Sequence, residues 1–156
     1  MFLIGNGRLF TRDENRPYIE DGGVVTQGDR IVAVGTSAEM KEKYPQAELV
    51  DARGQLIMPA FINTHTHIYS GLARGLSING YDPTNFYEIL DGMWWKLDRE
   101  LTLEDTRASA YATYLECIRN GVTTVFDHHA SYKEIPGSLF AIADCAKEMG
   151  VRSCLC

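Results

Sequence analysis

The chain has 156 residues, of which 45% are hydrophobic and 23% are charged, and its net charge at pH 7 is −6. This acidic balance argues against nucleic acid as a partner, because phosphate binding needs clustered lysine and arginine. No run of about 18 apolar residues occurs, which argues against a membrane-spanning helix. Residues 1–17 lack the basic and apolar regions of a signal peptide, so we expect none.

The four cysteines are not arranged like the disulfide framework of a small secreted domain. Two of them fall in helical patterns and two alternate along an expected strand; they are Cys117, Cys145, Cys154 and Cys156. We therefore expect a reduced, cytoplasmic protein.

The first 60 residues are rich in short β patterns. Strands are expected at 2–4 and 7–10, and a hairpin joins strands at 24–26 and 30–34 through a turn at Gly28-Asp29. A short helix or turn over 37–45 ends at Pro45, and two further strands flank Gly54. These elements predict a small sheet that is mostly solvated on one side.

The pattern changes after Pro59. An apolar strand over 60–67 is followed by a loop rich in glycine and serine, and then by a helix over 86–101 that is interrupted near Gly92. The clearest helix follows, with Thr102 as its N-cap, Asp105 in the capping-box position and Gly121 as its C-cap. Its expected buried stripe contains Ala108, Tyr111, Ala112, Leu115 and Ile118.

A buried strand over 122–129, an amphipathic helix over 138–149 and a strand from 151 complete the chain. The expected buried face of this helix contains Leu139, Ile142, Ala143, Ala146 and Met149, with Gly150 as its cap. Alternating strands and helices predict a parallel sheet, in which functional sites lie at the carboxyl ends of the strands. All four histidines fall at such ends.

His65 and His67 end the first of these strands. Residues two apart on a strand point to the same side, and neutral imidazole is a common ligand of zinc and iron. The pair therefore predicts a metal site, with Zn or Fe as the divalent metal.

His128 and His129 end the second strand, where adjacent residues point to opposite faces. Only one of them can therefore face the site, as a third ligand or as a hydrogen-bond donor to substrate. A loop histidine with a structural hydrogen bond is an equal alternative. Asp127 could orient one imidazole or could cap a loop.

Arg74 and the Trp94-Trp95 pair are further candidates for substrate binding. Arg74 lies in the loop after the first strand, where it could bind an anionic group of the substrate or serve as a structural tie. The two tryptophans could form an aromatic wall, although packing within a helix is favoured.

Two stretches, "VDARGQLIMPAFINTHTH" (50–67) and "NGVTTVFDHHAS" (120–131), resemble the amidohydrolase superfamily in its cytosine/guanine deaminase and triazine hydrolase branch. Within this branch, residues 94–156 are most similar to the SsnA group of aminohydrolases. The resemblance implies an α/β fold in which residues 59–156 are the first βα units of a (β/α)8 TIM barrel. Residues 1–58 would be the N-terminal segment of a small composite β-sandwich.

The resemblance also implies residue roles. His65 and His67 match the family's metal-binding pair, and His128 or His129 would be a wall residue of the substrate pocket. The remaining ligands and the general base would lie beyond this chain, so the catalytic base is unknown. Two positions depart from the family: Ala60 replaces a glycine, which would be strained at positive φ, and Ile89 stands where adenosine-type deaminases carry a tryptophan.

The expected function is therefore metal-dependent hydrolysis of a C–N bond in a nitrogen heterocycle, with a purine-like ring favoured. Triazine-type removal of chloride or alkylamine is an alternative, as is a short non-catalytic product that associates through an open sheet edge. Because a barrel takes about 250 residues, we expect this chain to be an N-terminal part that is inactive alone. The expected partner is a small-molecule heterocycle, without nucleic acid or membrane, and a homo-oligomer is left open because many relatives are oligomers.

Overall fold

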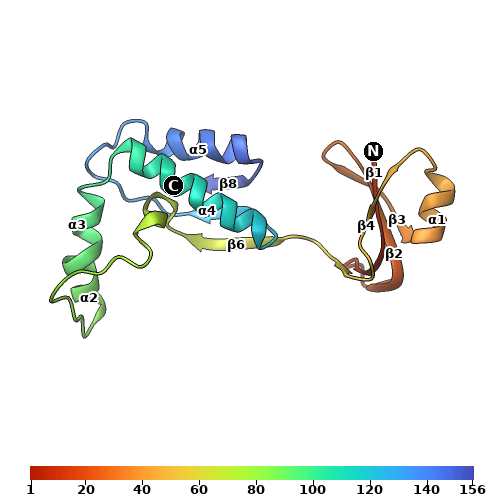
Figure 1. The fold of residues 1–156 in the computed structure, drawn as a ribbon, viewed down its shortest axis with the longest axis horizontal. Helices are drawn as coiled ribbons and strands as arrows, with labels where there is room; N and C mark the ends of the chain where they lie inside the picture. The colour runs from red at the N-terminus through yellow and green to blue at the C-terminus, as the bar shows by residue number, and fades with distance from the viewer. The chain divides into compact units, whose positions relative to one another are not determined.

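The computed structural model describes all 156 residues, and the chain divides into two compact units, Met1–Pro59 and Ala60–Cys156 (Figure 1). The assignment of the first unit to a composite sandwich stays a prediction. None of the helices is long and apolar enough to cross a membrane. All four cysteines are free.

The first unit is a five-stranded mixed sheet with one short helix. Strands β1 (Phe2–Phe10), β2 (Tyr18–Gln27) and β3 (Arg30–Thr36) pair antiparallel in chain order. Helix α1 (Ser37–Lys43) then leads to β4 (Glu48–Asp51) and β5 (Leu56–Ile57), which both pair parallel to β1. The β2–β3 hairpin with its turn at Gly28-Asp29 is confirmed, since Gln27 pairs with Arg30.

The two short strands expected within residues 2–10 are wrong, because β1 is one continuous strand with a register shift between Ile4 and Gly7. Asn6 lies inside this irregularity with a positive φ of 58°. Its side chain donates to Asp51 at 3.0 Å and accepts from Lys41 at 2.8 Å. The Gly5-Asn6-Gly7 sequence therefore forms a bulge, which bends a strand without ending it.

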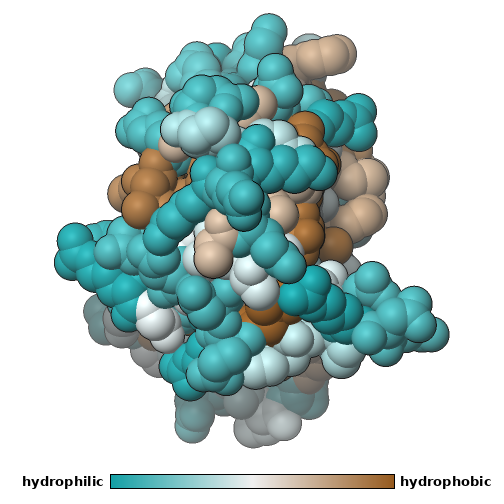
Figure 2. Space-filling view, turned by 90° about the vertical axis from the view of Figure 1, so that its right-hand side faces the viewer, coloured by the Kyte–Doolittle hydropathy of each residue, from teal (hydrophilic) through white to brown (hydrophobic).

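Two small apolar clusters form the core of the first unit. One contains Leu3, Val25 and Met40, and the other contains Leu9, Ile19 and Val24. The face of this unit in Figure 2 is largely hydrophilic, with separate apolar patches between the polar side chains. Apolar side chains that remain exposed in this unit include Ile31, Val34 and Leu49.

The second unit is a three-stranded parallel sheet in the order β6 (Phe61–Thr66), β7 (Val122–Asp127) and β8 (Arg152–Leu155). The expected strand–helix alternation and parallel pairing are confirmed. Helices α4 (Leu103–Arg119) and α5 (Ser138–Met149) connect the strands and pack side by side on the sheet (Figure 1). Their shared core includes Tyr114, Val125 and Ile142.

The segment between β6 and α4 contains a 3-10 turn η1 (Ile68–Ala73), helix α2 (Phe86–Ile89), a π-type turn η2 (Leu90–Trp94) and helix α3 (Trp95–Asp98). The interruption expected near Gly92 is confirmed as this π-type turn. A Cβ on Gly92 would lie 2.6 Å from the Tyr81 ring, so this contact requires glycine. Ala60 does not have a positive φ, and the substitution for glycine there causes no backbone strain.

Helix α4 begins and ends as the sequence predicts. The Thr102 side chain accepts from the Asp105 N–H at 3.2 Å, and the Thr102 N–H donates to the Asp105 carboxylate at 2.9 Å. This capping box lowers the pKa of Asp105, chiefly through the Thr102 side chain. Gly121 has a φ of 72°, the left-handed conformation expected after a helix.

The expected buried stripe of α4 is wrong. Leu115 and Ile118 are both 48% exposed, and the buried side chains are Thr106, Ser109, Ala110, Tyr114 and Cys117. The helix packs closely on η1, where a Cβ on Gly71 would lie 2.3 Å from Thr113 Oγ1. Such an approach needs small and hydroxyl side chains on the helix rather than leucine or isoleucine.

The face expected for α5 is partly confirmed. Ile142 and Ala146 are buried, whereas Leu139 is 37% exposed. Gly150 ends the helix in the left-handed conformation with a φ of 72°, as predicted.

Thr102→Ala should lower the free energy of unfolding by about 1 kcal/mol, because loss of an N-cap leaves helix N–H groups without an acceptor. Chemical denaturation of the chain and of the variant at pH 7 measures the change. An unchanged denaturation midpoint would show that the capping box does not stabilise α4.

Candidate metal centre

His65 and His67 lie at the carboxyl end of β6, and both side chains are exposed to solvent. Their Nε2 atoms are 3.2 Å apart, so the two rings face a common point, as the spacing predicts. The strand pairing is irregular between Asn63 and Thr66, and the Asn63 side chain accepts from the His65 N–H at 3.2 Å. The pair lines a pocket of about 390 Å³ together with His128 and other residues of the three strand ends.

The ring of His67 is held by the backbone of β7. Its Nδ1 lies 3.0 Å from the carbonyl oxygen of His128, 61 residues along the chain. Because a carbonyl oxygen only accepts, Nδ1 carries the proton and the lone pair of the neutral ring is on Nε2. This is the tautomer that a metal ligand needs, and a carbonyl contact of this kind is common behind metal-binding histidines.

The pair fits a divalent metal ion. Zinc binds imidazole nitrogen at about 2.0–2.1 Å in tetrahedral geometry, which places two ligand nitrogens about 3.3 Å apart. The separation of the two Nε2 atoms is 3.2 Å. No group of three or more histidine, cysteine, aspartate or glutamate side chains is arranged to hold a metal ion.

The structure directs His128 and His129 to different surroundings. The exposed His128 ring is 5.4 Å from that of His67, between ring centroids, and lines the same pocket. The His129 ring packs edge-on against Tyr69 at 5.1 Å and lines a separate pocket of about 310 Å³. Both ring nitrogens of His129 are buried without a hydrogen-bond partner, and burial lowers its pKa.

Tyr69 and Asp98 form a buried pair that sequence reasoning missed. The Tyr69 hydroxyl donates to Asp98 Oδ1 at 2.7 Å, and Asp98 is 4% exposed. Burial raises the pKa of both groups, and their contact raises that of the tyrosine further. The residues are 29 positions apart, and no local pattern marks Asp98, so only the position of Tyr69 two residues after His67 could have signalled this pair.

Arg74 and Trp94 lie in a larger pocket of about 680 Å³ beside His67. The ring centroids of Trp94 and His67 are 6.1 Å apart, whereas Trp95 packs edge-on against Tyr87 at 5.7 Å. Trp94 therefore lines the pocket, whereas Trp95 packs against a neighbouring helix residue. None of the ion pairs in the chain involves Arg74.

The hydrogen bonds of the Asp127 side chain go to Thr66 and Ile68, and not to an imidazole or to the loop that follows it. Its Oδ1 accepts from the N–H of Ile68, directly after His67, at 2.7 Å. The side chain is 3% exposed, and burial raises its pKa although the Ile68 N–H opposes this.

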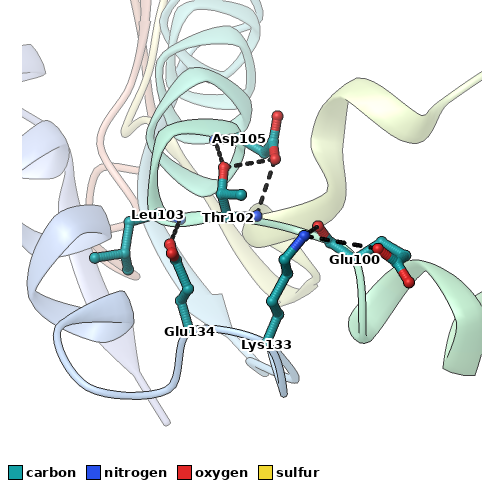
Figure 3. Close-up of polar contacts among 6 residues, drawn as sticks. All are labelled: Glu100, Thr102, Leu103, Asp105, Lys133 and Glu134. Atoms are coloured by element: carbon teal, nitrogen blue, oxygen red, sulfur yellow. Dashed lines mark hydrogen bonds and ion pairs between the residues drawn. The ribbon is translucent and has the colours of Figure 1, made fainter.

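The loop after β7 is attached to the start of α4 (Figure 3). The Glu134 carboxylate accepts from the Leu103 N–H at 2.5 Å, one of the helix N–H groups that the capping box leaves free. Lys133 donates to the carbonyl of Glu100 at 3.2 Å and pairs with the Glu100 carboxylate at 3.6 Å. These contacts anchor the loop that carries His128 and His129.

The fold and the site define a parallel α/β unit with a pair of histidines at the carboxyl end of its first strand. The profile of the Amidohydrolase family matches residues 56–156. The chain belongs to the amidohydrolase family. Residues 22–47 also match an imidazolonepropionase-like composite domain of bacteria.

Relatives of known activity cover most of this chain. The 5-methylthioadenosine/S-adenosylhomocysteine deaminase of Bacillus cereus is 30% identical over 122 residues, which are 78% of this chain and 27% of that protein. The 5'-deoxyadenosine deaminase of Methanosarcina mazei is 32% identical over 125 residues, which are 80% of this chain and 27% of that protein. The chain therefore spans about a quarter of the length of these relatives.

Among solved structures, a mutant of atrazine chlorohydrolase TrzN from Arthrobacter aurescens, complexed with zinc and atraton, is similar with a TM-score of 0.83 and 27% identity. The match covers 99% of this chain and 35% of that chain, and the chain matches its N-terminal part. Guanine deaminase of E. coli has a TM-score of 0.75 at 24% identity over 99% of this chain and 37% of that chain, which supports the fold alone.

We predict that His129 makes stability depend on pH. An unfolded histidine titrates near about pH 6.5, and burial lowers the pKa of His129 in the folded chain. As the pH falls below about 6.5, the unfolded state takes up the proton first, so the free energy of unfolding decreases until the folded pKa is reached.

His129→Gln should remove this decrease, which urea denaturation at pH 7.5, 6.5 and 5.5 measures as a difference from the unaltered chain. The buried carboxylates Asp98 and Asp127 act in the opposite direction, but they are present in both proteins and cancel in the difference. His65→Gln, which alters an exposed ring that is not among the causes of the lowered pKa of His129, is the control. Equal pH dependence in all three proteins would contradict the prediction.

Proposed function

We propose that this chain supplies the first two metal ligands of a metal-dependent aminohydrolase that hydrolyses a C–N bond in a nitrogen heterocycle. The observation that carries the proposal is the Nε2–Nε2 separation of 3.2 Å between His65 and His67, with the His67 ring oriented by a carbonyl. The match to the Amidohydrolase family and the deaminases among the relatives support it.

His65 and His67 would hold the metal, with zinc or iron as the candidates. A divalent ion bound there would lower the pKa of a coordinated water and so make a nucleophile available near neutral pH. Tetrahedral zinc takes four ligands, and the chain arranges no group of three. We therefore propose that the remaining ligands and the general base come from outside these 156 residues, as part of a TIM barrel, and that the chain alone is inactive.

The surrounding residues suit a flat heterocyclic substrate. Trp94 offers an aromatic surface beside His67, and the exposed His128 is placed to bind a polar edge of a ring in the pocket of the pair. Arg74, in the adjacent pocket, would bind an anionic group of the substrate. His129 would contact the substrate from its separate pocket.

We propose a purine-like substrate, in keeping with the resemblance to the SsnA group. The deaminases of adenosine derivatives among the relatives support a purine ring. Ile89, in the position of the stacking tryptophan, disfavours adenosine nucleosides themselves.

A triazine-type hydrolase is the second candidate. The similarity to atrazine chlorohydrolase, with a TM-score of 0.83, favours this alternative. The two candidates differ in their product, because deamination releases ammonia whereas the triazine reaction releases chloride or an alkylamine. Product analysis with aminopurines and chlorotriazines, in a protein that contains this chain and the remaining ligands, separates them.

The 156-residue chain should bind Zn²⁺ weakly through its histidine pair, and titration calorimetry measures the affinity. His65→Ala and His67→Ala should each lower the affinity at least tenfold, since each removes one of two ligands. His129→Gln, at a buried ring outside the pocket of the pair, should leave the affinity unchanged. If both variants bind Zn²⁺ as tightly as the unaltered chain, the metal centre is overturned.

A further inference from the structure

The side chain of Asp127 contacts the chain on both sides of His67. Its Oδ1 accepts from the Ile68 N–H at 2.7 Å and lies 3.4 Å from the hydroxyl of Thr66. Thr66 and Ile68 are the residues immediately before and after His67. One carboxylate oxygen therefore holds the backbone segment from which the His67 imidazole projects.

The backbone pairing around this segment is irregular, although the N–H of His128 donates to the carbonyl of Thr66 at 3.0 Å. The pairing of β6 with β7 is irregular between Asn63 and Thr66, and β6 ends at Thr66. His67 itself lies between the strand and η1, with a φ of −128° and a ψ of 79° that belong to neither element. The Asp127 carboxylate is one of the contacts that hold the backbone on both sides of His67.

The second oxygen of Asp127, Oδ2, is buried and makes no hydrogen bond within the chain. An unpartnered buried acceptor costs about 1–3 kcal/mol.

We propose that Asp127 is a positioning residue that fixes the backbone around His67, so that His67 Nε2 faces His65 Nε2. The next residue, His128, orients the ring of the same histidine through its carbonyl oxygen. Asp127, the last residue of β7, thus holds the backbone around His67, and His128, which follows it, orients the His67 ring. The role rests on the proposed function, because it matters only if the histidine pair binds a metal.

The test compares three variants of the 156-residue chain. Asp127→Ala removes both contacts, and Asp127→Asn retains an oxygen that can accept from Ile68. Tyr114→Phe is the matched control, because it removes a part-buried hydrogen bond of the same unit, between the Tyr114 and Ser153 hydroxyls at 2.8 Å, which involves neither histidine. Zn²⁺ affinity, the free energy of unfolding and hydrogen exchange at the Ile68 amide are measured for each protein.

Asp127→Ala should lower the Zn²⁺ affinity about tenfold to a hundredfold, the range typical of residues that support metal ligands. It should also accelerate exchange of the Ile68 amide in the metal-free chain. Asp127→Asn should retain most of the affinity and the slow exchange. Tyr114→Phe should be destabilised without a loss of affinity.

Equal affinity in Asp127→Ala and the unaltered chain would overturn the positioning role, as would an equal loss in Tyr114→Phe. If Asp127→Ala does not fold, Asp127→Asn and the control decide the result through the same three measurements. If the unaltered chain does not bind Zn²⁺, the metal centre fails instead. The ¹⁵N chemical shifts of the His67 ring and the exchange of the Ile68 amide then decide the positioning role. If Asp127→Ala changes neither of them, the positioning role is overturned.

Discussion

The parallel pairing of β6 with β7 is the constraint on which the candidate site depends. It places the carboxyl ends of two strands side by side, although they are about 60 residues apart in the chain. The ladder continues past the strands, since the N–H of His128 donates to the carbonyl of Thr66 at 3.0 Å. The imidazole of His67, the residue after β6, donates to the carbonyl of His128. The register of the two strands therefore determines the orientation of this ring.

Parallel pairing requires a crossover, and helix α4 provides it. The helix returns the chain to the start of β7 and also rests on η1, the turn that follows His67. The N–H of Leu72 in this turn donates to the Ser109 hydroxyl at 3.2 Å. The hydroxyl and small side chains on the buried face of α4 therefore support the same turn that Asp127 holds from the sheet. Helix α4 thus provides the crossover and also supports the turn beside the site.

Features with local signals could be predicted from the sequence. The capping box at Thr102 and Asp105, the glycine ends of α4 and α5, and the common side of His65 and His67 depend on residues a few positions apart. The buried face of α4 could not be predicted, because its partner is a close-packed turn rather than an apolar layer. The Tyr69–Asp98 pair and the contact of Asp127 with Ile68 join distant segments, so no periodicity marks them.

The distribution of unsatisfied groups separates the site from the supporting core. Five buried side-chain atoms lack a hydrogen-bond partner, and four of them belong to Asp127, His129 and Ser131. In the core, Tyr114 pairs with Ser153, whereas the buried hydroxyl of Thr106 has no partner. Buried polar groups in proteins are nearly always paired, and exceptions gather at functional sites. Residues 127–131 therefore hold most of the buried unpaired polar atoms of the chain, in the segment that begins beside the histidine pair.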